Sequence, residues 1–231
     1  MTTILAIETS RSLCSVAVQR NAELFEDTRK VERLHNEVVL EMIDDMCTAA
    51  GIARRTIDVV AFAAGPGSFT GVRIAAAVAQ GIAFGASACI VPVSSSRAMA
   101  FSAIDNLSTT PSRILTMTRS RADAYYLAGY VREGDALTLA VDDALRVQWP
   151  AELSQAEWIA VGDQPPWWQS VPRSARWGGE VAVTAATIAT LGLADFAAGE
   201  AVPPSAGLPR YVSGDSPWKK SAQKPTAPRN S

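Results

Sequence analysis

Three glycines and a proline lie within seven residues of this chain, where an apolar stretch gives way to a run of small residues. The segment is Gly65-Pro66-Gly67-Ser68-Phe69-Thr70-Gly71. Residues 57–63 before it are mostly apolar and β-branched, which predicts a buried strand, and residues 73–85 after it predict a helix. Glycines at such a junction allow positive φ and close backbone approach, and the first N–H groups of a helix can face an anion.

The spacing of these glycines excludes the two common phosphate-binding motifs. A P-loop has the form GxxxxGK followed by Ser or Thr, whereas Gly65 and Gly71 are one residue too far apart and Val72 replaces the lysine. In the dinucleotide fingerprint GxGxxG, Thr70 takes the position of the third glycine. Two interpretations therefore stay open: a structural turn that starts a helix, and an anion or partner site.

Composition narrows the class of protein. A chain of 231 residues with 48% hydrophobic content can form one or two globular lobes. We find no apolar run near the roughly 18 residues that span a bilayer and no basic region of a secretory signal, so we expect no membrane partner and a cytoplasmic location. The chain has three cysteines, Cys14, Cys47 and Cys89. Their odd number and wide spacing favour reduced thiols over a disulfide framework. A net charge of −2 argues against strong nucleic-acid binding by the chain alone and predicts that any RNA contact is shared with a partner.

The first hundred residues alternate between strand and helix patterns. Strands are predicted at residues 3–7, 14–18, 23–27 and 88–93, and Ser94 to Ser96 predict the cap of a short helix. A longer helix is predicted over residues 34–50, with Gly51 as its terminating residue. Its apolar, methionine-bearing face fits either a core or a docking surface. That face consists of Leu34, Val38, Val39, Met42, Ile43 and Met46.

The later part of the chain repeats this pattern loosely. Strands are predicted at residues 114–117, 124–131 and 137–141, followed by mixed helix and strand. All six tryptophans lie after residue 148, which indicates a loop-rich lobe and ordinary aromatic packing rather than base stacking. Residues 215–231 combine proline, lysine and polar residues, which predicts a disordered tail, with nucleic-acid contact as the alternative.

Residues 4–10, the helix that carries His35 and above all the Gly65–Ile74 segment resemble the TsaB (YeaZ) family of the bacterial tRNA threonylcarbamoyladenosine (t6A) system. The resemblance extends over roughly the first hundred residues and returns weakly later. It implies an α/β fold with two lobes of the actin, sugar kinase and Hsp70 ATPase type, each a mixed sheet flanked by helices. We place the lobes at residues 1–103 and 104–214.

The resemblance also implies a role. Members of the family are non-catalytic partners of the larger paralogue TsaD, which transfers the threonylcarbamoyl group to adenosine 37 of tRNA, and the ATPase TsaE joins them. The implied docking surface is a helical bundle formed by residues 34–50 and 70–85, with a homodimer as the fallback when TsaD is absent and no cofactor of its own. The expected partner-binding residues are Leu34, His35, Val38, Val39, Met42, Ile43, Met46, Phe69, Thr70, Val72 and Arg73.

A nucleotide-binding role is the alternative. The chain would then be a stand-alone phosphotransferase or ATPase of the same superfamily, with Glu8 holding a metal through water. The expected anion site consists of Glu8, Thr9, Ser10, Gly65, Gly67 and Ser68. His35 is the only histidine and Val39 stands where the HxxxH pair of the paralogue would continue, so we expect no His-based metal site and no protease activity.

Three positions depart from the family pattern. Thr118 stands where relatives have the acidic residue of an Asp-Ala-Arg turn, Gln80 replaces a common lysine, and Ser213 replaces the arginine of a Pro-x-Tyr-Leu-Arg ending. These changes put polar roles at the three positions in doubt and leave the apolar helix faces intact.

Overall fold

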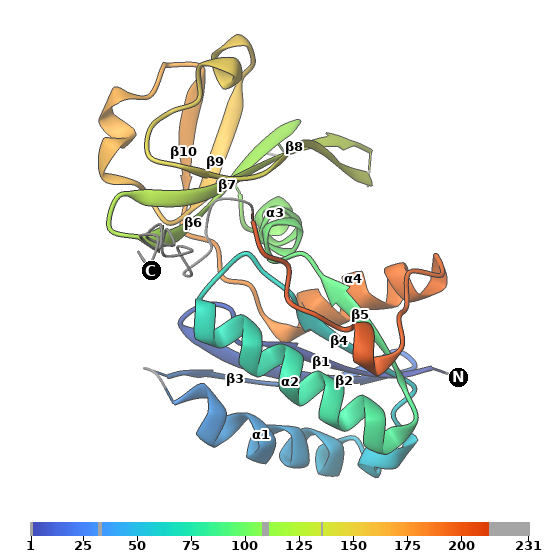
Figure 1. Ribbon diagram of the computed structural model, residues 1–231. Helices are drawn as coiled ribbons and strands as arrows, with labels where there is room; N and C mark the ends of the chain where they lie inside the picture. Colours follow the sequence, from blue (N-terminus) through green and yellow to red (C-terminus); the bar gives the residue numbers. More distant parts are fainter. Residues whose placement is uncertain (1, 32–33, 108–110, 135, 213–231) are drawn as a thin grey trace, which may run out of the picture.

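The computed structural model describes residues 2–31, 34–107, 111–134 and 136–212, and it contains two five-stranded sheets, one above the other in Figure 1. The strands of the first sheet are β1 (Thr3–Glu8), β2 (Leu13–Arg20), β3 (Glu23–Lys30), β4 (Val59–Ala63) and β5 (Cys89–Val93). Those of the second are β6 (Arg113–Arg121), β7 (Ala124–Glu133), β8 (Ala136–Arg146), β9 (Trp158–Gly162) and β10 (Ala175–Gly179).

The two sheets have the same topology. The first runs in the order β3-β2-β1-β4-β5, and the second runs β8-β7-β6-β9-β10. In each, the first three strands form an antiparallel meander, and the last two are added in parallel beside the first strand of the meander. The predicted α/β fold with two mixed sheets and a recurring pattern is therefore confirmed.

Helices cover both faces of the first sheet, because successive apolar side chains of its strands point to opposite faces. Leu5 and Ile7 point toward α1 (His35–Ala49) and α2 (Phe69–Ala86), whereas Ile4 and Ala6 point toward α4 (Ala185–Ala197). Helix α3 (Ser95–Asn106) lies between the two sheets in Figure 1 and packs on the second. Among the described residues there are also four short 3₁₀ turns: η1 (Arg54–Thr56), η2 (Ala151–Gln155), η3 (Pro166–Ser170) and η4 (Pro204–Ala206).

Tryptophans cover the outer face of the second sheet. Trp168 lies edge-on between Trp149 and Trp177, with ring centroids 6.4 and 5.2 Å apart. Trp158 on β9 is buried beneath them, and its Nε1–H donates to the carbonyl of Leu153 at 3.1 Å. This face is covered by loops and 3₁₀ turns, as expected of a loop-rich lobe whose tryptophans serve packing.

The helices do not follow the lobes that we placed at residues 1–103 and 104–214. Helix α4 packs on the first sheet although it follows the second, and α3 packs on β6 to β9 although it follows the first. Residues 201–212, here called the strap, also return to the first sheet, where Ile90 and Val202 exchange hydrogen bonds of 2.9 and 2.8 Å. The boundary at residue 103 stays a prediction, and the predicted tail at 215–231 lies outside the described residues.

Helix α2 is longer than predicted. It begins at Phe69 because Ser68 caps it, with Ser68 Oγ accepting a hydrogen bond from the Gly71 N–H. Its 18 residues have a mean hydropathy of 1.3, enough by length and composition for a membrane span. The expectation that no stretch approaches this length is wrong for α2, but one such helix is weak evidence, since core helices of soluble proteins also qualify.

Candidate functional site

One side of α1 belongs to the core of the first sheet. Val39, Met42 and Ile43 are fully buried, in the same apolar cluster as Leu5 and Phe62. A partner cannot reach these side chains unless α1 leaves the sheet. The predicted role of these three residues in partner binding is therefore corrected: this part of the methionine-bearing stripe is core, which is the other interpretation of the pattern.

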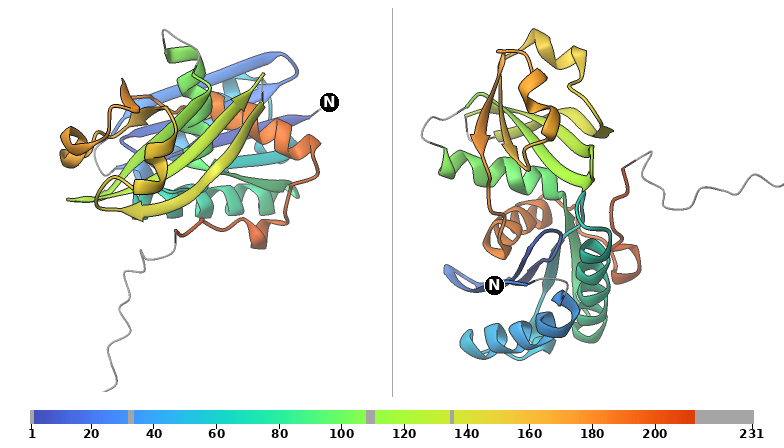
Figure 2. Two further views of the ribbon diagram at one scale, coloured as in Figure 1. Left: turned by 90° about the horizontal axis from the view of Figure 1, so that it is seen from above. Right: turned by 90° about the vertical axis from the view of Figure 1, so that its left-hand side faces the viewer.

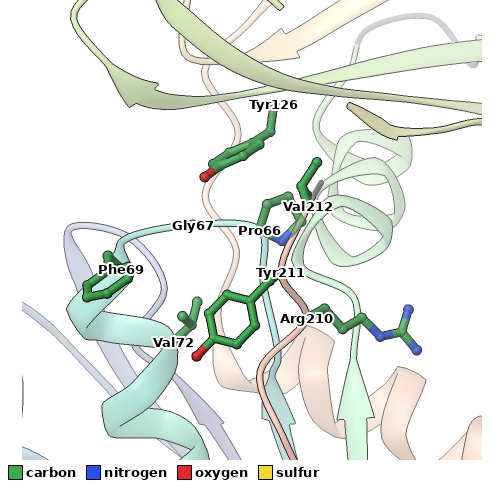
Figure 3. A pocket seen from close by; sticks show the side chains of 8 residues that line it. All are labelled: Pro66, Gly67, Phe69, Val72, Tyr126, Arg210, Tyr211 and Val212. Carbon is green, nitrogen blue, oxygen red and sulfur yellow. The ribbon is translucent and has the colours of Figure 1, made fainter. Parts of the chain in front are cut away.

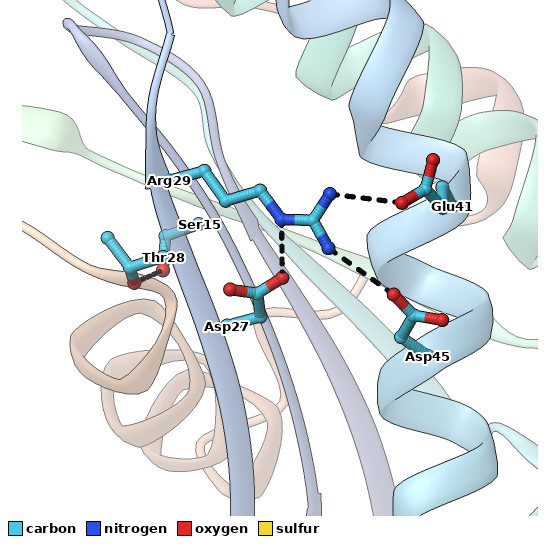
Figure 4. Close-up of polar contacts among 6 residues, drawn as sticks. All are labelled: Ser15, Asp27, Thr28, Arg29, Glu41 and Asp45. Atoms are coloured by element: carbon cyan, nitrogen blue, oxygen red, sulfur yellow. Dashed lines mark hydrogen bonds and ion pairs between the residues drawn. The ribbon is translucent and has the colours of Figure 1, made fainter.

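An ionic network fixes the opposite edge of α1. The Arg29 guanidinium on β3 contacts Asp27 at 2.8 Å, Glu41 at 3.1 Å and Asp45 at 3.3 Å (Figure 4). Glu41 and Asp45 are one turn apart on α1, so a single guanidinium holds two turns of the helix against the edge strand. Both carboxylates are nevertheless largely exposed, at 66% and 52%, so each contact is a surface ion pair.

The accessible apolar residues of α1 lie along its outer side. Leu34 is 47% exposed, and His35, Val38 and Met46 are half-buried. Leu40 is 46% exposed, and we did not single it out from the sequence. Leu40 lies six residues after Leu34, a spacing that places it off the apolar stripe of α1, and from the sequence we considered only that stripe.

Helix α2 presents small residues to solvent. Ala77, Gly81 and Gly85 are exposed at four-residue spacing, and a Cβ added at either glycine would meet nothing within 4 Å. Phe84 beside them is 81% exposed, and Phe69 at the start of the helix is 50% exposed. Such a strip lets a second helix approach closely.

We define the helix face as the exposed side of α1 and α2. Of the nine exposed large apolar residues that the described part of the chain contains, four lie on it and two more, Leu208 and Tyr211, lie on the strap beside α2 (Figure 2). The helix face consists of Leu34, Leu40, Phe69, Ala77, Gly81, Phe84 and Gly85. Phe84 was missed, although its place on the Ala77–Gly81–Gly85 strip is visible in the sequence.

The predicted residues at the start of α2 divide between surface and core. Thr70 is exposed, and the Arg73 guanidinium lies 3.2 Å above the Phe69 ring and 5.0 Å from the Tyr211 ring. Val72 is buried, which corrects its assignment as an accessible docking residue. Phe69, Val72 and Tyr211 surround a cavity of about 30 Å³ (Figure 3), which has room for little more than one water molecule.

The glycines of the Gly65–Gly71 segment allow it to pack on the turn between β1 and β2, residues 9–12, here called the β1–β2 turn. A Cβ at Gly67 would lie 2.5 Å from the Ser10 carbonyl oxygen, and one at Gly71 would overlap the Thr9 carbonyl. The Ser68 N–H donates to that Ser10 oxygen at 2.7 Å. Gly65 has φ +104°, a conformation that favours glycine. The structural interpretation of the segment therefore accounts for all three glycines.

Glu8 is buried at the end of β1. Its Oε1 accepts a hydrogen bond of 2.5 Å from the Ser10 N–H, whereas Glu8 Oε2 and Ser10 Oγ have no hydrogen-bond partner among the described residues. Burial raises the pKa of Glu8 to about 7, although the hydrogen bond from the Ser10 N–H and the nearby Arg11 charge lower it. Glu8 is thus a largely desolvated carboxyl, held by its own turn.

The predicted anion residues lie close together, since Glu8 and Ser68 both hydrogen-bond to Ser10 and Gly67 packs against it, but only two of them line the large cavity between the sheets. A cavity of about 420 Å³ between the sheets is lined by Ser10 and Ser68, but Glu8, Gly65 and Gly67 do not line it. The other lining residues are Arg11, Ser12, Phe69, Thr118, Arg119, Ser120 and Asp163. Within the described ranges no three His, Cys, Asp or Glu side chains gather as metal ligands.

Comparison with known proteins shows the family to which the chain is similar. The model of the family TsaD: tRNA N6-adenosine threonylcarbamoyltransferase matches residues 28–165. The "tRNA threonylcarbamoyladenosine biosynthesis protein TsaB" of Escherichia coli is 31% identical over 229 residues, 94% of this chain and 97% of that protein. The protein of the same name from Haemophilus influenzae is 37% identical over 131 residues, 57% of this chain and 55% of that protein.

Two solved structures agree with this. YeaZ from Pseudomonas aeruginosa superimposes with a TM-score of 0.79 at 29% identity, covering 92% of this chain and all of that one. A protein described as similar to peptidase YeaZ from Pseudomonas aeruginosa gives the same TM-score and coverage at 31% identity. The chain belongs to the TsaB (YeaZ) family.

Proposed function

We propose that this chain is a non-catalytic subunit of tRNA t6A biosynthesis that docks on a TsaD-type subunit through the helix face. The biosynthetic role is supported by the relative that matches almost the full chain, which is named for that pathway. The observation that carries the docking role is the Ala77–Gly81–Gly85 strip, which has open space above it and Phe84 beside it.

Burial of such a strip is favourable because apolar area removed from water contributes about 25 cal/mol per Å². Since the family model of TsaD matches residues 28–165, which include α1 and α2, a TsaD-type subunit has the corresponding segment. We infer that like helix faces pack in a four-helix bundle, and that two copies of this chain pair in the same way when TsaD is absent. TsaE and tRNA join through the complex, in the cytoplasm.

The non-catalytic assignment is our proposal as well. The alternative, a stand-alone nucleotide-dependent phosphotransferase, needs a carboxylate that faces bound phosphate. Glu8 does not line the cavity between the sheets, and burial favours its protonated form near neutral pH. ATP turnover by the purified chain, lost in Glu8→Ala, would favour that alternative.

Co-purification with a TsaD-type subunit tests the docking proposal. Phe84→Asp and Leu40→Asp place a charge on the helix face, and each is expected to abolish or strongly weaken co-elution. Leu139→Asp is the matched control, because Leu139 is similarly exposed but lies on β8 of the second sheet. Val39→Asp is unsuitable, since a charge in the core would unfold α1. Unchanged co-elution of the Phe84 and Leu40 variants contradicts the proposal.

A further inference from the structure

Both helices of the helix face hold the β1–β2 turn. From α2, the Ser68 N–H donates to the Ser10 carbonyl at 2.7 Å, and Thr9 Oγ1 donates back to the Gly71 carbonyl at 2.8 Å. From α1, His35 Nε2 lies 3.0 Å from the Arg11 carbonyl, and it is the donor because a carbonyl can only accept. The first residues of both helices are therefore fixed to one turn of four residues.

The side chain of the same turn reaches the second sheet. Arg11 Nη2 donates to Asp163 Oδ1 at 2.5 Å, and Arg11 Nη1 lies 3.4 Å from Thr118 Oγ1. Asp163 follows β9, where its N–H donates to the Met117 carbonyl and its Oδ2 accepts from the Arg119 N–H, both at 2.8 Å. Asp163, which accepts the hydrogen bond from Arg11, is therefore fixed to β6 and to the end of β9.

We propose that the Arg11–Asp163 ion pair is a latch that couples the helix face to the second sheet, so that docking on α1 and α2 and closure of the cavity between the sheets depend on each other. This inference rests on the proposed docking function. The two states are the pair formed and the pair broken. When the pair forms, it immobilises the β1–β2 turn, and the turn in turn positions His35 and Ser68 at the two helix starts.

The burial of the pair supports this role. The side chains of Arg11 and Asp163 are 20% and 32% exposed, whereas those of the surface pair Arg146–Glu152 are 39% and 61% exposed. A partly desolvated, charge-assisted pair is stronger than an exposed one, and the Arg119 N–H holds the carboxylate in place. Arg11 and Asp163 both line the cavity, so the latch borders the space between the sheets.

Asp163→Asn tests the latch, because it removes the charge and keeps the side-chain shape, at a residue outside the helix face. We expect the affinity for a TsaD-type subunit to fall about fivefold or more, as is typical of coupling between distant sites. Amide hydrogen exchange at residues 9–12 is expected to speed up in the free variant, and docking of the unaltered chain is expected to slow exchange at residues 118–121. Glu152→Gln, in the exposed Arg146 pair, is the control and should change neither readout.

A second variant guards against loss of fold. Arg11→Gln should give the same weaker docking with a thermal midpoint close to that of the unaltered chain. The latch would be overturned if Asp163→Asn and Arg11→Gln docked with unchanged affinity and if docking of the unaltered chain did not change hydrogen exchange at residues 118–121. Failure of the unaltered chain to dock at all would instead refute the proposed function.

Discussion

Replacing Glu8 with glutamine is expected to stabilise the chain at pH 8 relative to the unaltered protein, with a gain that shrinks as the pH falls toward 4.5. Burial raises the pKa of Glu8 from 4.5 to about 7 in the folded chain. The unfolded chain loses this proton near pH 4.5, whereas the folded chain keeps it up to about pH 7. The Glu8 contribution to stability is therefore full below pH 4.5 and is lost as the pH rises to 7.

The magnitude follows from the shift. One pKa unit corresponds to 1.36 kcal/mol, so the shift of Glu8 corresponds to about 3 kcal/mol between pH 4.5 and pH 8. Glutamine resembles the protonated carboxyl and can still accept from the Ser10 N–H. Its amide N–H₂ has no partner at the Oε2 position, but that cost is independent of pH and appears as a constant offset.

Urea unfolding at several pH values measures this effect. The difference in free energy of unfolding between Glu8→Gln and the unaltered chain should grow by about 3 kcal/mol from pH 4.5 to pH 8, with m unchanged. Glu133→Gln, at an exposed carboxyl on β7, is the matched control for the loss of a carboxylate. A difference for Glu8→Gln that stays constant over this range would refute the reasoning, since it would mean that Glu8 has the same pKa in both states.

Three further predictions concern close packing, core thiols and helix contacts. Gly71→Ala should lower the free energy of unfolding by roughly 1–3 kcal/mol, because the added Cβ overlaps the Thr9 carbonyl. Gly81→Ala should raise the free energy of unfolding by about 0.5–1 kcal/mol, because there is open space around Gly81. Urea midpoints of the two variants that move in the same direction would contradict this. Burial raises the pKa of Cys14 to about 11, so mass spectrometry at pH 8 should find the half-buried Cys89 alkylated first and Cys14 only after unfolding; early labelling of Cys14 would contradict its burial. Arg97→Ala removes two contacts of 2.7 and 2.8 Å to Asp195 and should speed hydrogen exchange in α4. Arg54→Ala, which breaks a more exposed ion pair, is the control and should not change exchange in α4. Equal exchange in α4 of both variants would argue against a stabilising contact between α3 and α4.

Much of the fold follows from local patterns in the sequence. Apolar runs such as residues 14–18 and 57–63 mark strands, and Ser94 and Gly51 mark helix ends through capping and positive φ. The Gly65–Gly71 segment is recognisable because its glycines have a steric cause, the close approach of the β1–β2 turn. Local chemistry decides the strands and the helix ends, so the sequence predicts them, whereas the turn against which the glycines pack is distant in sequence and only the structure shows it.

Features that depend on distant contacts are not predictable in this way. The apolar stripe of α1 fits a core and a docking surface equally well, and only the packing of Met42 against the sheet distinguishes them. Arg11 and Asp163 are 152 positions apart, and no periodicity links them. The strap and α4 return to the first sheet by tertiary contacts, so a division by sequence order assigned them to the other lobe.

The most direct test of the central claim is the mass in solution of this chain mixed with a TsaD-type subunit, measured by light scattering after size exclusion. We expect one species that contains both chains and that separates when the mixture is made with Phe84→Asp. Two separate species with the masses of the individual proteins, at concentrations where each is folded, would contradict the claim that the helix face is a docking surface.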